Sequence, residues 1–519
     1  MPQWRRVAKA TDIQEHQPLV IELAEDESVL ITRVDGKLTA CGATCPHYGG
    51  PLGDGVLRGG HVVCPYHNAT FDLATGELDR TPAIDDLPTY EVKEEDGSVF
   101  VGEKHEPGIS MPSGTDDRRV LIVGAGAAGA SCAETLRREG FAGSITMLTA
   151  DADPPYDRPM LSKGLLSGDA PEKYLPLRPN AFYEKLGISV ETGVTVTEVH
   201  PQTKEVVTAD GTTHTADMIL LATGGVPRRL DLPGADLDQI FTLRSHADAT
   251  AIMDAADGAK RAAVLGASFI GMEAAAQLRQ RGLEVTVIEP QPHPMEAALG
   301  PDIGAWLQRV HENEGVVFRM GARPAKLTGG GKVDGVELDD GSRVDAELIV
   351  MGVGVEPRVD YLAKSGLIDG DPTAGIRVDE HLATGAPGVY AAGDIAVYPG
   401  PTSEYRVEHW VHAQAQGHHV ALAMLGSDEP FRRVPFFWSR QYTTGVKFAG
   451  FPESFDHIQY DGVPGEGEFA AGFFVGNRLV AVAGMGKANK FAKVAEMLER
   501  GESLDRQGFL GVRDTPDVG

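Results

Sequence analysis

Two glycine-rich turns constrain the fold of this chain more than any other feature. Gly124-Ala125-Gly126-Ala127-Ala128-Gly129 follows an apolar run at 120–123 and precedes a helical segment at 130–138. Gly266-Ala267-Ser268-Phe269-Ile270-Gly271 lies 142 residues later, after a similar run and before a helix that continues through Arg279. A strand, a glycine turn, a helix and a second strand predict a doubly wound α/β dinucleotide-binding domain. The repeat therefore predicts two such domains.

An acidic residue follows the second strand of each unit. The glycines allow backbone N–H groups to approach a pyrophosphate at a helix N-terminus, and the small hydroxyl of Ser268 still permits this approach. Asp151 follows the strand at 144–149 and can accept hydrogen bonds from ribose hydroxyls. Glu289 closes the strand at 284–288 and favours NADH over NADPH, because it would repel a 2′-phosphate. The alternative is that Glu289 is a surface acid without a ligand, and the nearby Arg281 and His293 leave the cofactor preference open.

The remainder of the chain changes pattern at clear points. Residues 1–105 alternate short strand-like runs with turn signals, which is typical of an all-β domain. Residues 106–118 are rich in Pro, Gly, Ser and charge, as linkers are. Residues 429–519 mix strand-like and helical segments, which predicts an α+β domain. We expect a multidomain chain in which 119–234 and 355–428 form the first dinucleotide-binding domain and 235–354 form the second.

Cysteine and histidine occur together twice in the N-terminal segment. Cys45-Pro46-His47 is followed by Cys64-Pro65-Tyr66-His67. One cysteine from each motif can hold one iron and one histidine from each can hold the other, which is the ligand set of a Rieske 2Fe–2S centre. The predicted metal ligands are therefore Cys45, His47, Cys64 and His67.

A structural zinc on these four residues is the competing interpretation. The single residue between Cys45 and His47 is shorter than the two to four residues that usually separate zinc ligands, so the iron–sulfur centre is favoured. Cys41 is interpreted as a small buried residue rather than as a further ligand.

The residues around the two motifs carry a family resemblance. Cys45-Pro46-His47-Tyr48-Gly49-Gly50-Pro51-Leu52 and Cys64-Pro65-Tyr66-His67-Asn68-Ala69-Thr70-Phe71-Asp72 resemble the loops of Rieske ferredoxins and of oxygenase-type Rieske domains. The respiratory-complex subtype adds a disulfide, a serine and a tyrosine near the cluster, and the corresponding positions here are Gly50 and Tyr66, Ala69 and Phe71. The resemblance implies a reduction potential toward the low end of the Rieske range, which is roughly −150 to +300 mV.

Further motifs resemble those of flavoproteins that bind two dinucleotides. Pro155-Tyr156-Asp157-Arg158-Pro159-Met160-Leu161-Ser162-Lys163 resembles a signature of oxygenase-coupled ferredoxin reductases and of apoptosis-inducing-factor-like proteins. In these families the arginine and the lysine lie beside FAD. Segments 222–225 and 389–394 resemble the later FAD-contacting segments, and 407–410 with 437–439 resemble those that approach the flavin from the C-terminal side.

The resemblance implies a Rieske domain ahead of an FAD/NADH reductase, in the order found in the Rieske-bearing apoptosis-inducing-factor-like group. FAD would occupy the first dinucleotide-binding domain and NADH (or NADPH) the second, and 429–519 would be a C-terminal reductase or interface domain. The expected cofactor-binding residues are Gly124, Gly126, Gly129, Asp151, Arg158, Lys163, Thr223, Gly224, Gly393, Asp394, Trp410 and Trp438 for FAD, and Gly266, Ser268, Gly271 and Glu289 for NAD(P)H.

Composition excludes several classes of partner. The 47 Lys and Arg against 75 Asp and Glu give a formal net charge of −28, which would repel nucleic acid and anionic lipid. No apolar run approaches the ~18 residues of a membrane helix. The basic start lacks the apolar stretch of a secretory signal, and the four cysteines are too few for a disulfide scaffold. We expect a cytoplasmic protein with neither nucleic-acid nor membrane partners.

The absence of certain residue types excludes some of the reactions known for this kind of fold. Disulfide reductases of the same fold need a cysteine pair beside the flavin, whereas only Cys132 follows Cys64 and is expected in the core. The chain also lacks a mononuclear-iron facial-triad domain, so it is not the oxygenase itself. A metal cluster on His409, His412, His418 and His419 is the less favoured interpretation of a helix packed near the flavin, since 418 and 419 do not share a helix face.

These predictions combine into an electron-transfer enzyme. Hydride from NADH would reduce FAD, and single electrons would then pass to the Rieske centre and on to a protein acceptor, a ferredoxin or an oxygenase component. The direction of flow through the centre and the formation of a homodimer stay open, and no catalytic proton donor is predicted. The alternative is a redox-responsive binding protein similar to apoptosis-inducing factors, in which a long-lived NADH complex changes the oligomeric state.

Overall fold

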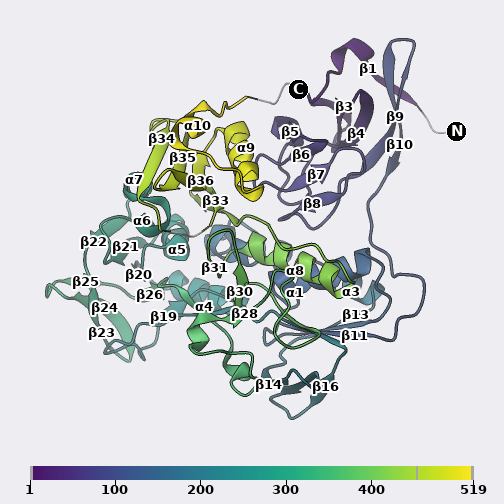
Figure 1. The fold of residues 1–519 in the computed structure, drawn as a ribbon. Coiled ribbons are helices and arrows are strands. Elements are labelled where there is room, and N and C mark those ends of the chain that lie inside the picture. The colour runs from purple at the N-terminus through teal and green to yellow at the C-terminus, as the bar shows by residue number, and fades with distance from the viewer. Residues whose placement is uncertain (1–3, 452–453, 516–519) are drawn as a thin grey trace.

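The N-terminal segment forms two antiparallel sheets, drawn in purple in Figure 1. The structure is a computed structural model that describes residues 4–451 and 454–515. The larger sheet has the order β1-β10-β9-β4-β3-β2 and the smaller the order β5-β6-β7-β8. The strands are β1 (Arg5–Lys9), β2 (Leu19–Ala24), β3 (Glu27–Val34), β4 (Lys37–Gly42), β5 (Val56–Arg58), β6 (His61–Val63), β7 (Thr70–Asp72), β8 (Leu78–Arg80), β9 (Thr89–Glu95) and β10 (Ser98–His105).

The first dinucleotide-binding unit is built on a five-stranded parallel sheet of order β13-β12-β11-β17-β29. Its strands are β11 (Arg119–Val123), β12 (Ser144–Leu148), β13 (Ile188–Glu191), β17 (Met218–Leu221) and β29 (Val389–Ala391). Helix α1 (Ala127–Arg138) connects β11 to β12, and α8 (Trp410–Met424) packs along it. A Cβ on Gly417 of α8 would come 2.1 Å from the carbonyl oxygen of Ala128, so only glycine allows this helix contact.

Helix α1 begins three residues before the expected start at 130. Gly129 lies inside its first turn, where a Cβ would come 2.0 Å from the carbonyl oxygen of Gly124. The third glycine of the motif therefore belongs to the helix and to its packing against the turn. The smaller elements of this unit are α2 (Arg158–Met160), α3 (Asn180–Lys185), β14 (Val196–His200), β15 (Glu205–Thr208), β16 (Thr213–Thr215), β28 (Ile376–Arg377), β30 (Ala396–Pro399) and β31 (Glu404–Tyr405).

The second unit repeats the arrangement with the parallel sheet β19-β26-β20-β21-β22. Its elements are β19 (Ile240–Thr242), α4 (His246–Asp257), β20 (Arg261–Leu265), α5 (Phe269–Gln280), β21 (Glu284–Glu289), α6 (Glu296–Leu299), α7 (Pro301–Asn313), β22 (Val317–Met320) and β26 (Leu348–Met351). An outer antiparallel sheet holds β23 (Pro324–Gly330), β24 (Lys332–Leu338) and β25 (Arg343–Asp345). Between the two units, β18 (Gly225–Pro227) pairs with β27 (Val355–Pro357).

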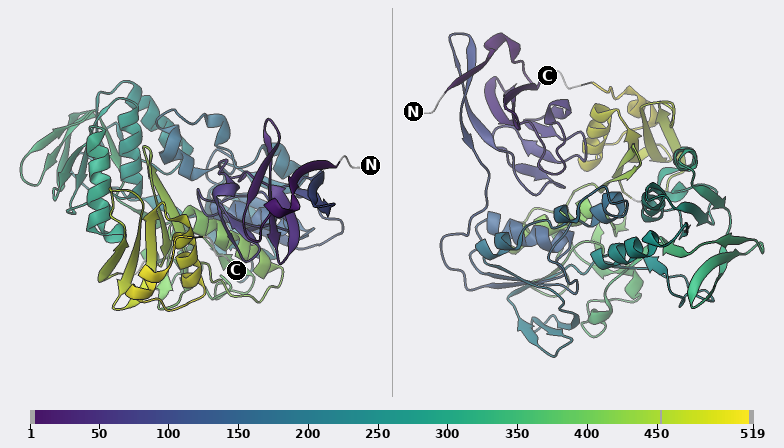
Figure 2. Two further views of the ribbon diagram at one scale, coloured as in Figure 1. Left: turned by 90° about the horizontal axis from the view of Figure 1, so that it is seen from above. Right: turned by 180° about the vertical axis from the view of Figure 1, so that it is seen from behind.

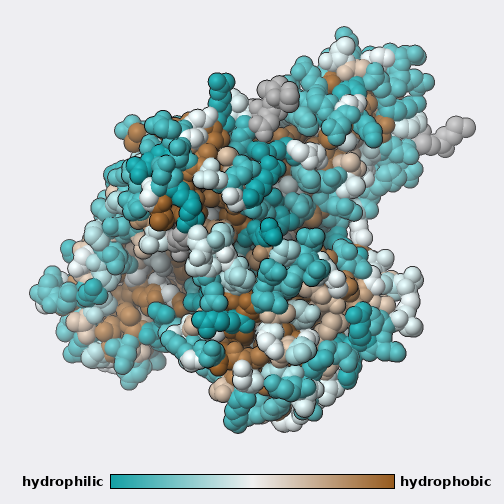
Figure 3. Space-filling model, viewed as in Figure 1, coloured by the Kyte–Doolittle hydropathy of each residue, from teal (hydrophilic) through white to brown (hydrophobic). Residues whose placement is uncertain are grey.

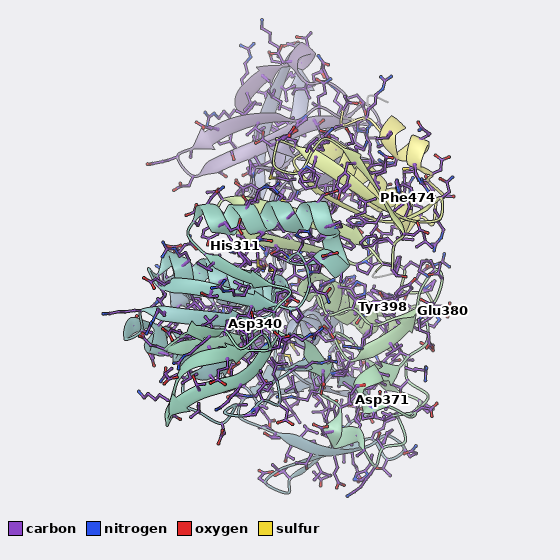
Figure 4. All side chains as sticks on the ribbon, turned by 90° about the vertical axis from the view of Figure 1, so that its left-hand side faces the viewer. His311, Asp340, Asp371, Glu380, Tyr398 and Phe474 are labelled. Carbon is purple, nitrogen blue, oxygen red and sulfur yellow. The ribbon has the colours of Figure 1, made fainter. Side chains whose placement is uncertain are left out.

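The C-terminal residues form an antiparallel sheet of order β32-β33-β36-β35-β34 with helices against it. Its elements are β32 (Phe436–Gln441), β33 (Thr444–Gly450), β34 (His457–Asp461), β35 (Phe469–Val475), β36 (Arg478–Met485), α9 (Ala488–Glu499) and α10 (Arg506–Gly511). Figure 4 labels His311 of α7 below this sheet, and its Nε2 lies 3.1 Å from the side-chain oxygen of Gln441. The expected fold class, with an all-β domain, two doubly wound units and a C-terminal α+β domain, is confirmed.

The N-terminal domain lies beside the C-terminal domain and above the first dinucleotide-binding unit in Figure 1 and in the right-hand view of Figure 2. Arg80 pairs with Glu499 of α9 at 2.6 Å. The Thr81 hydroxyl donates to the carbonyl of Val411 in α8 at 3.1 Å. Arg178 of the first unit pairs with Asp85 at 2.7 Å. The N-terminal domain is therefore held against two other domains in addition to its covalent link through 106–118.

The outer surface is consistent with the charged composition. On the face shown in Figure 3, hydrophilic residues cover most of the rim, and hydrophobic residues form smaller patches between them. Within the described residues, no helix combines the length and the apolar character needed to cross a bilayer.

Candidate functional site

The two cysteine–histidine loops share one backbone design. The N–H of Cys45 donates to the carbonyl of Gly50, and the N–H of Gly49 donates back to the carbonyl of Cys45, at 2.8 and 3.0 Å. In the other loop the N–H of Cys64 donates to Ala69 at 2.8 Å, and the N–H of Asn68 donates to Cys64 at 3.2 Å. Gly49 and Asn68, each four residues after its cysteine, have φ values of 69° and 62°. Glycine and asparagine are the residues that tolerate this left-handed turn.

The loops bring the four predicted ligands together as two pairs. The Nδ1 atoms of His47 and His67 lie 3.1 Å apart, and the thiols of Cys45 and Cys64 are hydrogen-bonded to each other. Both cysteines are buried, with 1% and 2% of their surface exposed. In the described part of the chain, no three His, Cys, Asp or Glu side chains gather as ligands of a single ion. Two thiols on one side and two imidazole nitrogens on the other fit a binuclear centre with two protein ligands on each iron.

The protonation states suit metal binding. Burial lowers the pKa of His47 to about 4. It also lowers the pKa of His67 to about 2, with a contribution from nearby positive charges. The hydrogen bond between the two thiols lowers the pKa of Cys64 and raises that of Cys45. Neutral imidazoles and a thiol that ionises easily are the forms that bind iron.

A cavity of about 1280 Å³ lies where the two dinucleotide-binding units and the C-terminal domain meet. Such a volume exceeds the usual range of small-molecule sites, about 300–1,000 Å³, and has room for parts of two dinucleotides. Of the predicted cofactor residues, its walls include Gly124, Gly126, Asp151, Arg158, Lys163, Thr223, Gly224, Ser268, Gly393, Asp394, Trp410 and Trp438.

Four predicted residues lie outside the cavity wall: Gly129, Gly266, Gly271 and Glu289. A Cβ on Gly271 would come 2.1 Å from the carbonyl oxygen of Gly266, so this pair shapes the turn rather than lining the space. Gly126 behaves differently, because the nearest atom to its added Cβ is Nε of Arg158 at 4.0 Å. The space beside Gly126 is open, as close approach of a pyrophosphate to the backbone requires.

Carboxylate–arginine pairs line the first unit's part of the cavity. Arg158 binds the Asp151 carboxylate at 2.6 Å, and Arg244 binds the Asp394 carboxylate at 2.7 Å. Arg244 and Asp394 are distant in sequence, whereas Asp151 and Arg158 are seven residues apart. Both arginines and Asp151 are partly exposed, and Asp394 is buried. The carboxylates can receive ribose or ribityl hydroxyls, and the guanidinium groups can face phosphate.

A buried carboxylate in the cavity wall connects the two units. Glu273 of α5 accepts a hydrogen bond from the Lys163 ammonium at 2.8 Å and another from the Ser439 hydroxyl at 2.8 Å. Ser162 also donates to this carboxylate, which is only 1% exposed. The network fixes the Lys163 ammonium at the cavity wall.

Glu289 folds back on its own glycine turn. One carboxylate oxygen accepts from the N–H of Ala267 at 2.7 Å, and the other accepts from the N–H of Gln291 at 3.0 Å. The acid thus caps the turn in this structure, and its role in choosing between NADH and NADPH stays a prediction.

The cluster loops meet the cavity at Trp438. The indole ring lines the cavity, and the His67 ring centroid lies 4.2 Å from it on the cluster side. His47 approaches the same indole edge-on at 5.8 Å. The Tyr48 hydroxyl donates to Asp157, next to Arg158 in the first unit. A single aromatic side chain therefore separates a predicted cluster ligand from the cavity.

The remaining candidates from the sequence are dispersed. His409 lines the cavity against Phe437, with ring centroids 4.5 Å apart, whereas His418 lies 3.1 Å from the hydroxyl of Thr135. His412 packs against Tyr398, labelled in Figure 4, and His419 packs against Phe431. Cys41 and Cys132 are fully buried, as expected.

Three contributors were missed by sequence reasoning: Arg244, Glu273 and Lys447. Lys447 of β33 donates to the backbone carbonyl of Pro65 in the second cluster loop. Burial lowers the pKa of Lys447 to about 8, although the Cys64 thiolate opposes this shift. None of the three lies in a recognisable motif, and their partners are distant in sequence, so no local signal could have identified them.

Family comparisons assign the three regions. Residues 118–417 match the family described as pyridine nucleotide-disulphide oxidoreductase. The chain belongs to this family. Residues 3–91 match the Rieske 2Fe-2S domain, and residues 436–511 match the reductase C-terminal domain. The protein is accordingly an FAD-dependent NAD(P)H oxidoreductase of the ferredoxin-reductase type that carries a Rieske 2Fe–2S cluster.

Relatives of this family match over different lengths. Apoptosis-inducing factor 3 of Homo sapiens is 36% identical over 96% of this chain and 85% of its own length. The 5,5′-dehydrodivanillate O-demethylase ferredoxin reductase subunit of a Sphingobium species is 32% identical over 76% of this chain and 96% of its own. The covalent putidaredoxin reductase–putidaredoxin complex includes a chain that superposes with a TM-score of 0.72 at 28% identity, covering 76% of this chain and 96% of that one.

Proposed function

We propose that this protein moves electrons from NAD(P)H through FAD to its own Rieske centre, and from there one at a time to a separate protein acceptor. When bound, FAD accepts a hydride and the iron–sulfur centre carries single electrons. One NAD(P)H then yields NAD(P)⁺, one proton and two electrons for two one-electron acceptors. The observation that supports this order is the contact of His67 with Trp438, whose ring lines the dinucleotide cavity.

The chain's residues would divide the work as follows. The Gly126 backbone, Arg158 and Asp394 would hold FAD, and the turn at 266–271 would bind NAD(P)H. The network of Lys163 and Glu273 would position the two against each other, since it ties the first unit to helix α5 of the second. The paired cysteines and histidines would hold the cluster against Trp438. Each of these residues would bind or orient a cofactor, and none is assigned a role in proton transfer.

The acceptor is proposed to be a ferredoxin or an oxygenase component. The named relatives include reductase subunits of oxygenase systems, and one superposed structure is a reductase joined to its putidaredoxin. Here the chain supplies a Rieske domain of its own, docked on the reductase. We therefore place the external acceptor after the Rieske centre rather than after the flavin.

An anaerobic rapid-freeze experiment tests the internal route. Holoenzyme is mixed with NADH, and the Rieske EPR signal is followed over a wide range of protein concentrations. The first-order rate constant should not change with concentration, because Trp438 and His67 belong to one chain. A rate that rises in proportion to protein concentration, or a flavin that is reduced while the cluster stays oxidised, would contradict the proposal.

A ligand variant separates the two halves of the route. His67→Ala should lose the cluster, which otherwise contributes about two irons and two labile sulfides per chain. Its reduction of a two-electron dye by NADH should persist, while its reduction of a one-electron protein acceptor should fall sharply. His61→Ala is the matched control, because His61 lies in the same domain and its Nδ1 lies 2.9 Å from the carbonyl oxygen of Gly59 in its own turn. Equal retention of both activities in His67→Ala would remove the cluster from the main route.

A redox-responsive binding protein is the second candidate function. It is favoured by the likeness to apoptosis-inducing factor 3, which extends over 96% of the chain rather than over the reductase part alone. Steady-state turnover with an artificial acceptor discriminates between the two functions. Slow turnover with a persistent long-wavelength charge-transfer band would favour the second.

A further inference from the structure

A partly buried cation reaches the cluster loops from another domain. Lys447 lies on β33 of the C-terminal sheet, and its ammonium donates to the carbonyl of Pro65, the residue after the predicted ligand Cys64. Lys447 itself is partly buried on this strand, so its ammonium has lost part of its contact with water. Among the described residues, no carboxylate forms an ion pair with Lys447; the charge acting on it is that of Cys64.

The other charges near the cluster are already balanced or exposed. Lys163 is paired with the Glu273 carboxylate at 2.8 Å. Arg440 also acts on His67 but lies at the surface. The buried acid nearby, Asp157, accepts the Tyr48 hydroxyl. Among the described residues, Lys447 is thus a partly buried cation that contacts a cluster loop and has no acidic partner.

A partly buried ammonium without an acidic partner is unfavourable, because it has lost part of its water and no negative charge compensates it. The group that can compensate it is the cluster itself. Two ferric ions, two sulfides, two thiolates and two neutral imidazoles carry no net formal charge, and one added electron makes the centre a monoanion. A fixed positive charge at the loop therefore favours the reduced form over the oxidised form.

We propose that Lys447 is a positioning residue of the electron route: from the C-terminal domain, its charge stabilises the reduced Rieske centre and makes the docked centre a better electron acceptor. This inference rests on the proposed function, in which the centre takes electrons from the flavin. It also explains why the cation is supplied across a domain interface. The stabilisation is complete only while the Rieske domain is docked beside Trp438, where electrons arrive.

Three substitutions separate charge from hydrogen bonding. Lys447→Met removes both, Lys447→Gln removes the charge but keeps an N–H donor, and Lys447→Arg keeps both. Each holoenzyme is titrated spectroelectrochemically with chemical mediators, and the midpoint potential of the cluster is read from its visible and EPR signals. Iron and sulfide contents and the EPR line shape confirm that the centre is loaded in each variant.

The charge-based role makes a definite prediction. The equilibrium constant for one-electron reduction should fall about tenfold in both Lys447→Met and Lys447→Gln, which is about 59 mV for a one-electron couple. Lys447→Arg should keep the wild-type potential. Lys326→Met is the matched control, because Lys326 is an exposed residue of the outer strand β23, and its potential should not change. A wild-type potential in loaded Lys447→Gln would overturn the proposal and leave only a hydrogen-bonding role.

The outcome of this test does not depend on whether the proposed function is correct. The mediators reduce the cluster without NAD(P)H, so the potential is measured even if the flavin does not supply the electrons. A lowered potential in Lys447→Gln with no NADH-driven cluster reduction in the wild type would retain the role of the charge but contradict the internal route. If Lys447→Met does not load iron, Lys447→Gln against Lys447→Arg still decides the question.

Discussion

The two dinucleotide-binding units have the same turn but use their acids differently. In both, a Cβ on the last glycine of the turn would strike the carbonyl oxygen of the first, at 2.0 Å for Gly129 and 2.1 Å for Gly271. Asp151 of the first unit lines the cavity and pairs with Arg158 at 2.6 Å. Glu289 of the second unit instead caps its own turn, by accepting from the N–H of Ala267 at 2.7 Å.

The difference shows which parts of the fold are general and which are adapted to a ligand. The glycine contacts satisfy helix packing and are therefore the same in both units. The surroundings of the first turn come from many segments, including Arg244, Asp394 and Trp410, which together enclose one side of the cavity. The second turn contributes Ser268, Phe269 and Ile270 to the cavity wall, and its Ser268 hydroxyl donates to the carbonyl of Gly352. This contrast is expected where one nucleotide stays bound and the other exchanges in every turnover.

The largest effect is expected where the two units are joined. Lys163→Met should destabilise the protein by about 3–5 kcal/mol, because it leaves the buried Glu273 carboxylate without its cation. Thermal and denaturant unfolding of the holoenzyme measure this loss. Adding Glu273→Gln should recover part of the stability, since a neutral amide can still bond to Ser439. Additive losses in the double variant would mean that the pair is not coupled.

The glycine contacts can be broken one unit at a time. Gly129→Ala and Gly271→Ala should each cost about 1–3 kcal/mol through overpacking against a carbonyl that cannot move. Gly129→Ala should lose FAD, whereas Gly271→Ala should keep FAD and raise the KM for NADH. Flavin absorbance after gel filtration and steady-state kinetics report the two outcomes. Gly258→Ala is the control, because an added Cβ there meets nothing within 4 Å; equal FAD loss in both variants would contradict separate roles.

Asp151 and Glu289, the acids of the two units, allow a more specific comparison of nucleotide binding. Glu289→Ala should raise the ratio of kcat/KM for NADPH to that for NADH about tenfold, or about 1.4 kcal/mol, because it removes the charge that would face a 2′-phosphate. Asp151→Ala should lower FAD retention and leave that ratio unchanged. Steady-state kinetics with both nucleotides measure the ratio. An unchanged ratio in Glu289→Ala would show that the acid only caps the turn and that specificity resides elsewhere.

The smallest effect is expected at the starts of the central strands. Arg119 binds Asp217 at 3.1 Å at the start of β11, and Arg261 binds Glu347 at 3.2 Å at the start of β20. Both pairs are largely exposed, so Arg119→Ala and Arg261→Ala should each change stability by about 0–1 kcal/mol. Denaturant midpoints, with FAD content as a check, test this. A larger loss in either variant would reveal a structural role that the exposed geometry does not indicate.

Sequence reasoning captured the features that local patterns encode. The β-α-β units follow from strand, glycine turn and helix within about thirty residues. The cluster loops follow from cysteine and histidine spacing, and the fold class follows from the two together. The start of α1 was placed too late because Gly129 was taken as part of the turn, although it packs inside the helix.

Contacts between domains could not be predicted from any local sequence pattern. His67 meets Trp438, Pro65 meets Lys447, and Arg178 meets Asp85 only after separate domains have docked. Periodicity and spacing describe what a segment does with its neighbours in sequence, not which surface it later covers. The position of the cluster beside the cavity could therefore not be predicted from the sequence.

The segment at 106–118 has a consequence for how the two redox parts find each other. A short tether gives the Rieske domain an effective concentration of about millimolar at its docking surface. Contacts such as that of Arg80 with Glu499 then need only orient the domain, because a bimolecular encounter is no longer required. Dilution of the protein should not separate the Rieske domain from the dinucleotide-binding units, and the affinity of the docking contacts can be modest. The covalent link thus keeps the Rieske domain close to the dinucleotide-binding units. A reductase and a ferredoxin that are separate molecules need tight binding for the same purpose.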